Sequence, residues 1–111
     1  MKKLITLLSV CGAIVLLTQC SPKIPASFAS TATTPAGKVD EVKKHYTDDQ
    51  VAQGKVIFQS NCAKCHKLKL PETRTVDQWE QILPSMVHKA KLSSDDAGMV
   101  RAYLLENAKM S

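Results

Sequence analysis

Strand-like alternation of apolar and polar residues is absent from this chain of 111 residues. We therefore expect an all-α protein. The one long apolar run, residues 4–18, is shorter than the roughly 20 residues that a membrane-spanning helix needs, and it suits a signal peptide instead. A formal net charge of +5 is modest. On a chain that carries an export signal, it argues against nucleic-acid binding.

The N-terminus has the pattern of a bacterial export signal. Two lysines precede the apolar run, and the run ends in Leu17-Thr18-Gln19-Cys20. This resembles the lipobox of bacterial lipoproteins, although Gln19 stands where a small residue is usual. We expect a signal peptide over 1–19 and a lipidated Cys20, with a plain secretory signal or an uncleaved anchor as the alternatives. Each alternative places the rest of the chain outside the cytoplasm.

The segment after Cys20 is rich in Ser, Thr, Ala and Pro. It has little apolar periodicity, so we interpret residues 20–46 as a flexible tether. Such a tether would reach about 25–30 Å. Packing of part of the segment on the domain is the alternative, and Phe28 is the first candidate for it.

The most specific motif is Cys62-Ala63-Lys64-Cys65-His66. The spacing C-x-x-C-H is typical of covalent haem attachment. On a helical turn the two thiols and the imidazole share one face, where each Cys adds to a vinyl group and His66 binds the iron. A disulfide, a redox-active thiol pair and a zinc site are the alternatives. They are disfavoured because the pair lacks a βαβ context and a complete zinc ligand set.

The rest of the chain, 47–111, is short for a self-sufficient core, and a covalent haem would enlarge that core. Three helices are predicted. The first opens with a capping box at Thr47, and the second spans about 76–89 with Pro84 as an expected kink or break. The third follows Ser93 as N-cap and ends near Asn107.

These positions resemble class I c-type cytochromes. Gly54 and Phe58 precede the haem motif at the family's spacing, and Val100 and Tyr103-Leu104 match its C-terminal helix. The resemblance covers about 60 residues, from Thr47 to the end of the chain. It implies a small cytochrome c fold in which the N- and C-terminal helices cross at Gly54, with one covalent haem c as the core.

The same resemblance implies His66 as the proximal iron ligand and a methionine as the distal one. We prefer Met86, because it follows Trp79 at the family's spacing and lies beside Pro84. The alternatives are His88, Met99, Met110 and an open position. Met99 shares a helix face with Tyr103, which favours core packing for it.

Two further haem contacts are implied more weakly. In the family, a proline carbonyl accepts the proton of the proximal imidazole, and Pro71 is the only proline in the loop after the motif. Trp79 is a candidate donor to a haem propionate, with plain core burial as the alternative. Arg74 is a second candidate partner for a propionate.

The resemblance implies a one-electron carrier rather than an enzyme, tethered by lipid in the bacterial cell envelope and facing the periplasm or held at the outer membrane. Its partners would be redox proteins. Lysines near the haem motif, Lys64, Lys67, Lys69, Lys89 and Lys91, favour partners with acidic surfaces. The alternatives are a haem-based sensor and a fixed electron-transfer subunit of a periplasmic dehydrogenase or oxidase.

Overall fold

The computed structural model describes residues 34–111, and this part of the chain is all-helical. Four α-helices and one 3₁₀ turn follow in the order α1 (Pro35–His45), α2 (Asp48–Cys62), η1 (Pro71–Thr73), α3 (Val76–Ala90) and α4 (Ser94–Asn107). No regular strand occurs among these residues; the one isolated bridge joins Thr75 to Lys109. None of the helices within 34–111 has the length and apolar character needed to cross a bilayer.

Each helix begins where a polar side chain satisfies its first free amides. Thr47 and Thr75 form complete capping boxes with Gln50 and Gln78, and Ser93 accepts from the amide of Asp96. The predicted starts of the three helices are thereby confirmed. The third helix also ends at Asn107 as expected.

Pro84 does not break α3, which runs without interruption to Ala90. The expected break at Pro84 is therefore wrong for this structure. The helix ends instead at Lys91, which adopts the left-handed conformation with φ of 52°. Only three residues, 91–93, then separate α3 from α4.

The tether expected over 20–46 contains a fourth helix. Thr34 caps α1 by accepting a hydrogen bond from the amide of Gly37, and Pro35 occupies the first turn. Val39 and Val42 lie three residues apart on one face of α1 and are buried in the core. The packed domain thus includes α1, and a tether boundary at residue 46 is wrong. Cys20, the signal peptide and Phe28 lie outside the described residues.

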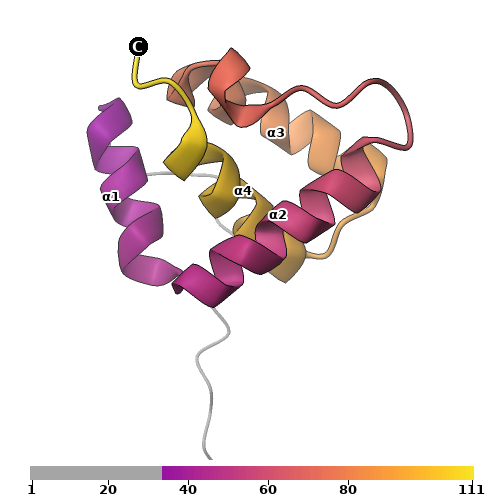
Figure 1. The fold of residues 1–111 in the computed structure, drawn as a ribbon, viewed down its shortest axis with the longest axis horizontal. Coiled ribbons are helices and arrows are strands. Elements are labelled where there is room, and N and C mark those ends of the chain that lie inside the picture. The colour runs from indigo at the N-terminus through magenta and orange to yellow at the C-terminus, as the bar shows by residue number, and fades with distance from the viewer. Residues whose placement is uncertain (1–33) are drawn as a thin grey trace, which may run out of the picture.

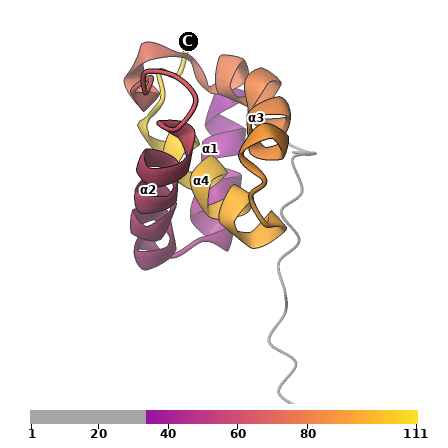
Figure 2. The same cartoon turned by 90° about the vertical axis from the view of Figure 1, so that its right-hand side faces the viewer.

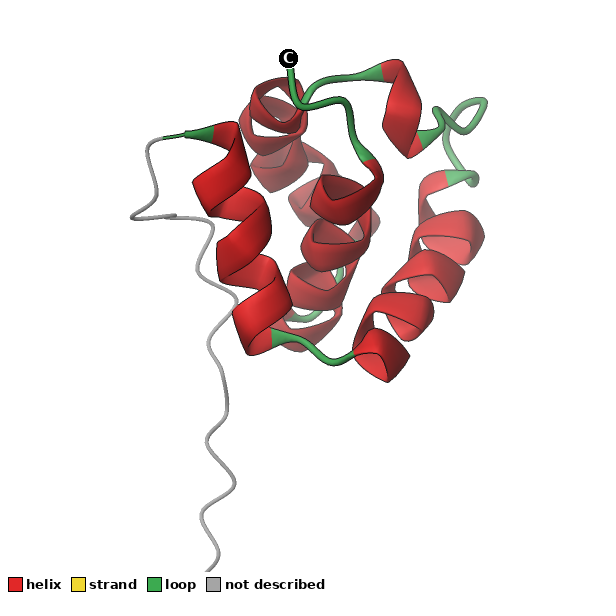
Figure 3. Ribbon diagram, turned by 60° about the vertical axis from the view of Figure 1, so that its left-hand side comes forward, coloured by secondary structure: helices red, strands yellow, loops and turns green. Residues whose placement is uncertain are grey.

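Helix α4 is the centre of the arrangement. It contacts α1, α2, α3 and η1, and its contact with α2 is the most extensive. Figure 1 shows α4 between α1 and α2, and Figure 2 shows it between α2 and α3. Figure 3 shows a longer loop leaving the C-terminal end of α2, in contrast to the short connections elsewhere.

The crossing of α2 and α4 takes place at Gly54, as the sequence predicts. A Cβ added to Gly54 would overlap the main-chain carbonyl of Met99. Only glycine allows the two backbones to approach this closely. One turn later, Phe58 lies 5.8 Å from Tyr103 between ring centroids, so an aromatic contact extends the crossing.

Gly54→Ala tests this crossing by the sign of its effect. In an ordinary helix interior the change would stabilise by about 1 kcal/mol. Here the Met99 carbonyl is backbone and has little freedom to move, so we expect the free energy of unfolding to fall by about 1–3 kcal/mol. Urea denaturation of the purified protein measures the change. Gln53→Ala, at an exposed position of α2, is the control and should change stability by less than about 0.5 kcal/mol. A stabilised Gly54→Ala variant would contradict the close approach.

Candidate functional site

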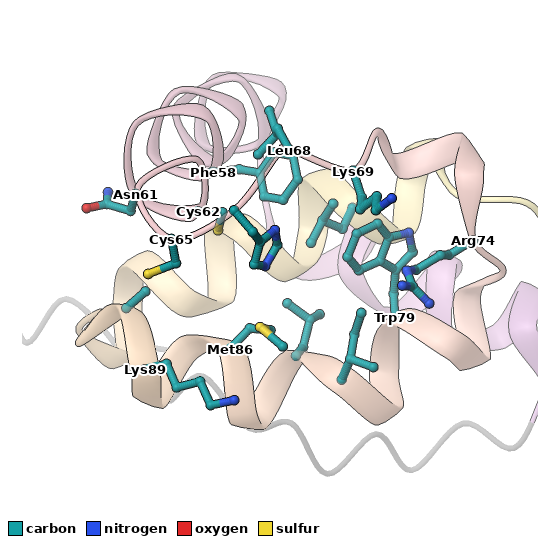
Figure 4. A pocket seen from close by; sticks show the side chains of 15 residues that line it. Phe58, Asn61, Cys62, Cys65, Leu68, Lys69, Arg74, Trp79, Met86 and Lys89 are labelled. Atoms are coloured by element: carbon teal, nitrogen blue, oxygen red, sulfur yellow. The ribbon is translucent and has the colours of Figure 1, made fainter.

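The loop end of α2, the loop that follows it, α3 and α4 enclose a cavity of about 350 Å³. This volume lies within the range of about 300–1,000 Å³ that small-molecule sites occupy. Its walls are largely apolar, and the apolar side chains are Phe58, Leu68, Trp79, Ile82, Leu83, Met86, Ala90 and Leu104. Figure 4 shows Met86 on α3 across the cavity from Phe58 and Cys62.

The three side chains of the C-x-x-C-H motif all line this cavity. Cys62 is the last residue of α2 and is half-buried, whereas Cys65 and His66 follow in an exposed turn. Both thiols are free, without a disulfide between them. The end of α2 therefore directs two thiols and an imidazole at one space, as the spacing of the motif predicts.

The imidazole of His66 is oriented by its neighbour. Its Nδ1 lies 3.0 Å from the main-chain oxygen of Lys67, which suits a ring protonated at Nδ1. That tautomer leaves the lone pair of Nε2 for another partner, and a neutral imidazole nitrogen of this kind is the commonest metal ligand in proteins. The expected bond from His66 to the Pro71 carbonyl is not the one formed in this structure.

Pro71 and Trp79 instead bond to each other. The indole N–H of Trp79 donates to the buried Pro71 carbonyl over 2.8 Å, and the residue as a whole is 4% exposed. Burial is thus what the structure shows for Trp79. With its N–H satisfied, it is not a free donor for a ligand carboxylate. The bond holds η1 against α3 and fixes one wall of the cavity.

Among the distal candidates, only Met86 lines the cavity. It is half-buried and lies on the face of α3 that also carries Trp79 and Leu83. Met99 is buried in the core at the Gly54 crossing, as its spacing predicts. His88 and Met110 are exposed and lie outside the cavity lining.

The charge of the cavity is of one sign. Lys69, Arg74 and Lys89 line it, and no Asp or Glu within residues 34–111 does. The guanidinium carbon of Arg74 lies 5.8 Å from the centre of the Trp79 ring, so a cation–π contact holds it near the cavity wall. An apolar space with three cations at its edge suits a flat apolar molecule that carries carboxylates.

The lining can therefore be compared with the needs of a c-type haem. The haem ring is flat and apolar, its two vinyl groups need two thiols, its iron needs axial donors, and its propionates are anionic. Cys62, Cys65, His66 and Met86 supply the thiols and donors, and the cations supply the opposite charge. Within residues 34–111, no three His, Cys, Asp or Glu side chains converge as in a metal site made by protein alone. The residues present fit the haem.

Burial and the neighbouring Cys65 raise the pKa of the Cys62 thiol. A raised pKa lowers the thiolate fraction at neutral pH, whereas redox-active thiol pairs depend on a lowered one. The environment of Cys62 therefore favours a passive attachment point over a redox-active dithiol.

Sequence reasoning missed part of the lining. Leu68 lies in a loop without periodicity, so only the fold shows that it faces the cavity, whereas Lys69, which the sequence places near the haem motif, does line the cavity. Leu104 was expected on an apolar face of the last helix, but its place at the cavity depends on how α4 crosses α2.

Comparisons of the chain with protein-family models, with curated proteins and with solved structures find no match. The case for the site therefore comes from its own residues and geometry.

The hydrogen bond between Trp79 and Pro71 gives a direct prediction. Trp79→Phe keeps an aromatic ring but leaves the buried Pro71 carbonyl without its donor. We expect the free energy of unfolding to fall by about 1–3 kcal/mol. Arg74→Ala removes the cation–π contact and one cation of the cavity edge but leaves the bond between Trp79 and Pro71, so it should cost about 1 kcal/mol or less. Thermal or urea unfolding compares the two variants. Equal stability of Trp79→Phe and the parent protein would show that this bond does not hold the wall.

Proposed function

We propose that this protein is a one-electron carrier that holds a single covalent haem c in the cavity between α2, α3 and α4. The observation that carries the proposal is the convergence of four side chains. Cys62, Cys65 and His66 come from one short motif, and Met86 comes from a different helix, yet all four line one apolar space. The contact of Phe58 with Tyr103 beside Gly54 adds to it, because it is the helix crossing that the resemblance to class I cytochromes implies.

The bound haem would supply an iron that alternates between the ferric and ferrous states. The chain would do the rest. Cys62 and Cys65 retain the group between encounters, His66 and Met86 bind the iron, and the apolar wall around Trp79 excludes water. A methionine thioether together with a histidine imidazole would favour the ferrous iron and raise its reduction potential. Because His66 and Met86 would both hold the iron, no substrate would need to bind, which is why we propose a carrier rather than an enzyme.

The partners are proposed from charge. Lys69 and Lys89 line the cavity, and Lys64 and Lys67 lie in the exposed turn of the motif. A cluster of cations around the site of electron exit accelerates encounter with an acidic redox protein, and salt weakens the effect. Lys64 also donates to the side-chain oxygen of Asn61 over 3.0 Å, so one cation of the cluster is held in place.

The location is proposed from the sequence alone. A lipidated Cys20 would attach the domain to a membrane of the bacterial cell envelope, outside the cytoplasm. Because α1 packs on the domain, the part of the chain between Cys20 and the domain ends near residue 34 instead of residue 46, and it lies outside the described residues.

A haem-based sensor is the second candidate. The observation in its favour is the exposure of the part of α3 around the proposed distal ligand, where Pro84, Ser85, His88 and Lys89 all face solvent. A sensor would leave one position at the iron open to a small molecule and would not be six-coordinate in both oxidation states. A carrier should instead give a six-coordinate low-spin spectrum in both oxidation states.

Covalent attachment is the first prediction of this proposal. Protein from its native membrane should keep its colour on the polypeptide after denaturation and acid–organic extraction, because thioether bonds survive both treatments. Its mass should exceed that of the processed chain by one haem. Replacing Cys62 and Cys65 together by Ser should abolish attachment, while Ser60→Ala, at an exposed position of the same helix, should not. Colour that extracts freely from the parent protein would refute the proposal.

Ligation by Met86 is the second prediction. Thioether-bound ferric haem has a weak charge-transfer band at the red end of the visible spectrum, and Met86→Ala should remove it and lower the reduction potential. Met99→Ala should keep the band and reduce stability by about 2–5 kcal/mol, because Met99 is buried in the core. Met110→Ala, at an exposed position, should change neither property. A band that persists in Met86→Ala would exclude this ligand. A spectrum altered only in His88→Ala would move the assignment to His88.

A further inference from the structure

Helix α3 carries the proposed distal ligand, and its two halves are held very differently. The first half is buried at Val76, Trp79 and Leu83. Its main chain is also tied to the C-terminal segment, because the amide of Val76 donates to the Lys109 carbonyl over 2.9 Å. After Pro84 the helix has no fully buried residue. Met86, Val87 and Ala90 are half-buried, and the rest face solvent.

Pro84 marks the boundary between these halves, and it weakens the helix there. A proline has no N–H, so the helical hydrogen bond to the carbonyl four residues earlier is missing. That carbonyl belongs to Glu80. The proline ring also presses against the same carbonyl, which would ordinarily kink or break a helix. Yet α3 continues without interruption to Ala90.

The carbonyl of Glu80 lacks its helical hydrogen bond, but the side chain of the same residue is held by a buried ion pair. Its carboxylate accepts from Nε of Arg101 over 2.6 Å, and the two side chains are 11% and 5% exposed. Arg101 lies in the middle of α4 and also approaches Glu41 of α1 at 3.8 Å. Two charges withdrawn from water in this way make a bond whose disruption leaves an uncompensated buried charge.

The other ion pair of α3 differs from this one in its exposure to solvent. Lys38 contacts Asp77 over 2.7 Å, but the Asp77 side chain is 51% exposed. This pair lies seven residues before Pro84 and near the firmly buried start of the helix. It therefore serves as a matched comparison, with the same helix and the same type of bond but far less burial.

From this juxtaposition we propose that Glu80 is a positioning residue for Met86. The buried pair with Arg101 braces α3 at the point where Pro84 removes a helical hydrogen bond, and it holds the exposed half of the helix with Met86 against the cavity. The inference rests on the proposed function for the role of Met86, and we call this its functional part. Its mechanical part, that the ion pair stabilises the second half of α3, does not depend on that function.

The mechanical part predicts the effect of Glu80→Gln on hydrogen exchange. Glutamine has the same shape but no charge, so the bond from Arg101 to α3 would lose its charged acceptor. In the full-length protein with its cofactor, amides of residues 85–90 should exchange at least about tenfold faster. Amides of residues 97–105 in α4 should change less. Asp77→Asn should leave both sets unchanged.

The functional part predicts a change in displacement of the distal ligand by added imidazole. The apparent affinity for imidazole rises with the fraction of molecules in which Met86 has left the iron. Glu80→Gln should therefore raise that affinity about tenfold, and Asp77→Asn should not change it. A brace that served stability alone would lower the unfolding midpoint and leave imidazole affinity unchanged.

A second substitution separates a brace from a general weakening. Pro84→Ala restores the missing N–H at an exposed position, so residue 84 could again donate to the Glu80 carbonyl and the helix would need the ion pair less. It should slow exchange at 85–90 in the parent protein. In the double variant with Glu80→Gln it should recover most of the lost protection and most of the change in imidazole affinity, which is non-additive behaviour.

The outcomes are distinct. Unchanged exchange at 85–90 in Glu80→Gln, or strictly additive effects with Pro84→Ala, would overturn the brace. Altered exchange with unaltered imidazole affinity would confine Glu80 to a structural role and overturn its link to Met86. A parent protein that carries no covalent haem would refute the proposed function, while the exchange data would still decide the brace.

Discussion

The close approach of α2 and α4 at Gly54 is the constraint on which the rest of the structure depends. The two backbones touch there. Phe58 and Cys62 follow Gly54 at intervals of four residues, so all three lie on the same face of α2. Phe58 meets Tyr103 of α4 and also contacts Trp79 edge-to-face, with ring centroids 6.2 Å apart. One helical face therefore makes the crossing, the inner wall of the cavity and the first attachment thiol in turn.

Of the remaining helices, α3 completes the cavity and α1 packs outside it. Helix α1 covers the side of α4 and α3 away from the cavity, and none of its residues lines the cavity. Helix α3 closes the opposite wall, where Trp79 is held by Pro71 and Glu80 by Arg101. The site is thus built on buried contacts at its base and becomes progressively more exposed toward Met86 and Lys89.

Local signals in the sequence were sufficient for much of the fold. The capping boxes at Thr47 and Thr75 and the cap at Ser93 define helix starts through bonds over three residues, so they are readable without tertiary information. A glycine inside a helix has a known cost, and only a close crossing explained it. The C-x-x-C-H motif placed three cavity residues because its members are adjacent in the chain.

The rest depended on contacts distant in sequence or on weak signals. Helix α1 did have a signal, since Thr34-Pro35 is a cap followed by a proline in the first turn, with Val39 and Val42 at helical spacing. The Ser, Thr and Pro content before it obscured that pattern. The bond between Trp79 and Pro71 and the pair between Arg101 and Glu80 span 8 and 21 residues, and no periodicity reports them. The helix continues through Pro84 because the tertiary contacts of α3 outweigh the local effect of the proline.

The central claim is that a haem would fill this cavity, held by His66 and Met86 and lined by Ile82 and Leu104. Proton NMR of the reduced full-length protein tests that claim directly, since a haem ring current shifts nearby methyl groups far upfield. The account predicts that the methyl of Met86 is shifted most, that methyls of Ile82 and Leu104 are shifted less, and that those of Met110 and Val56 stay at ordinary positions. Ordinary positions for Met86, Ile82 and Leu104 in a protein that carries haem would contradict the account.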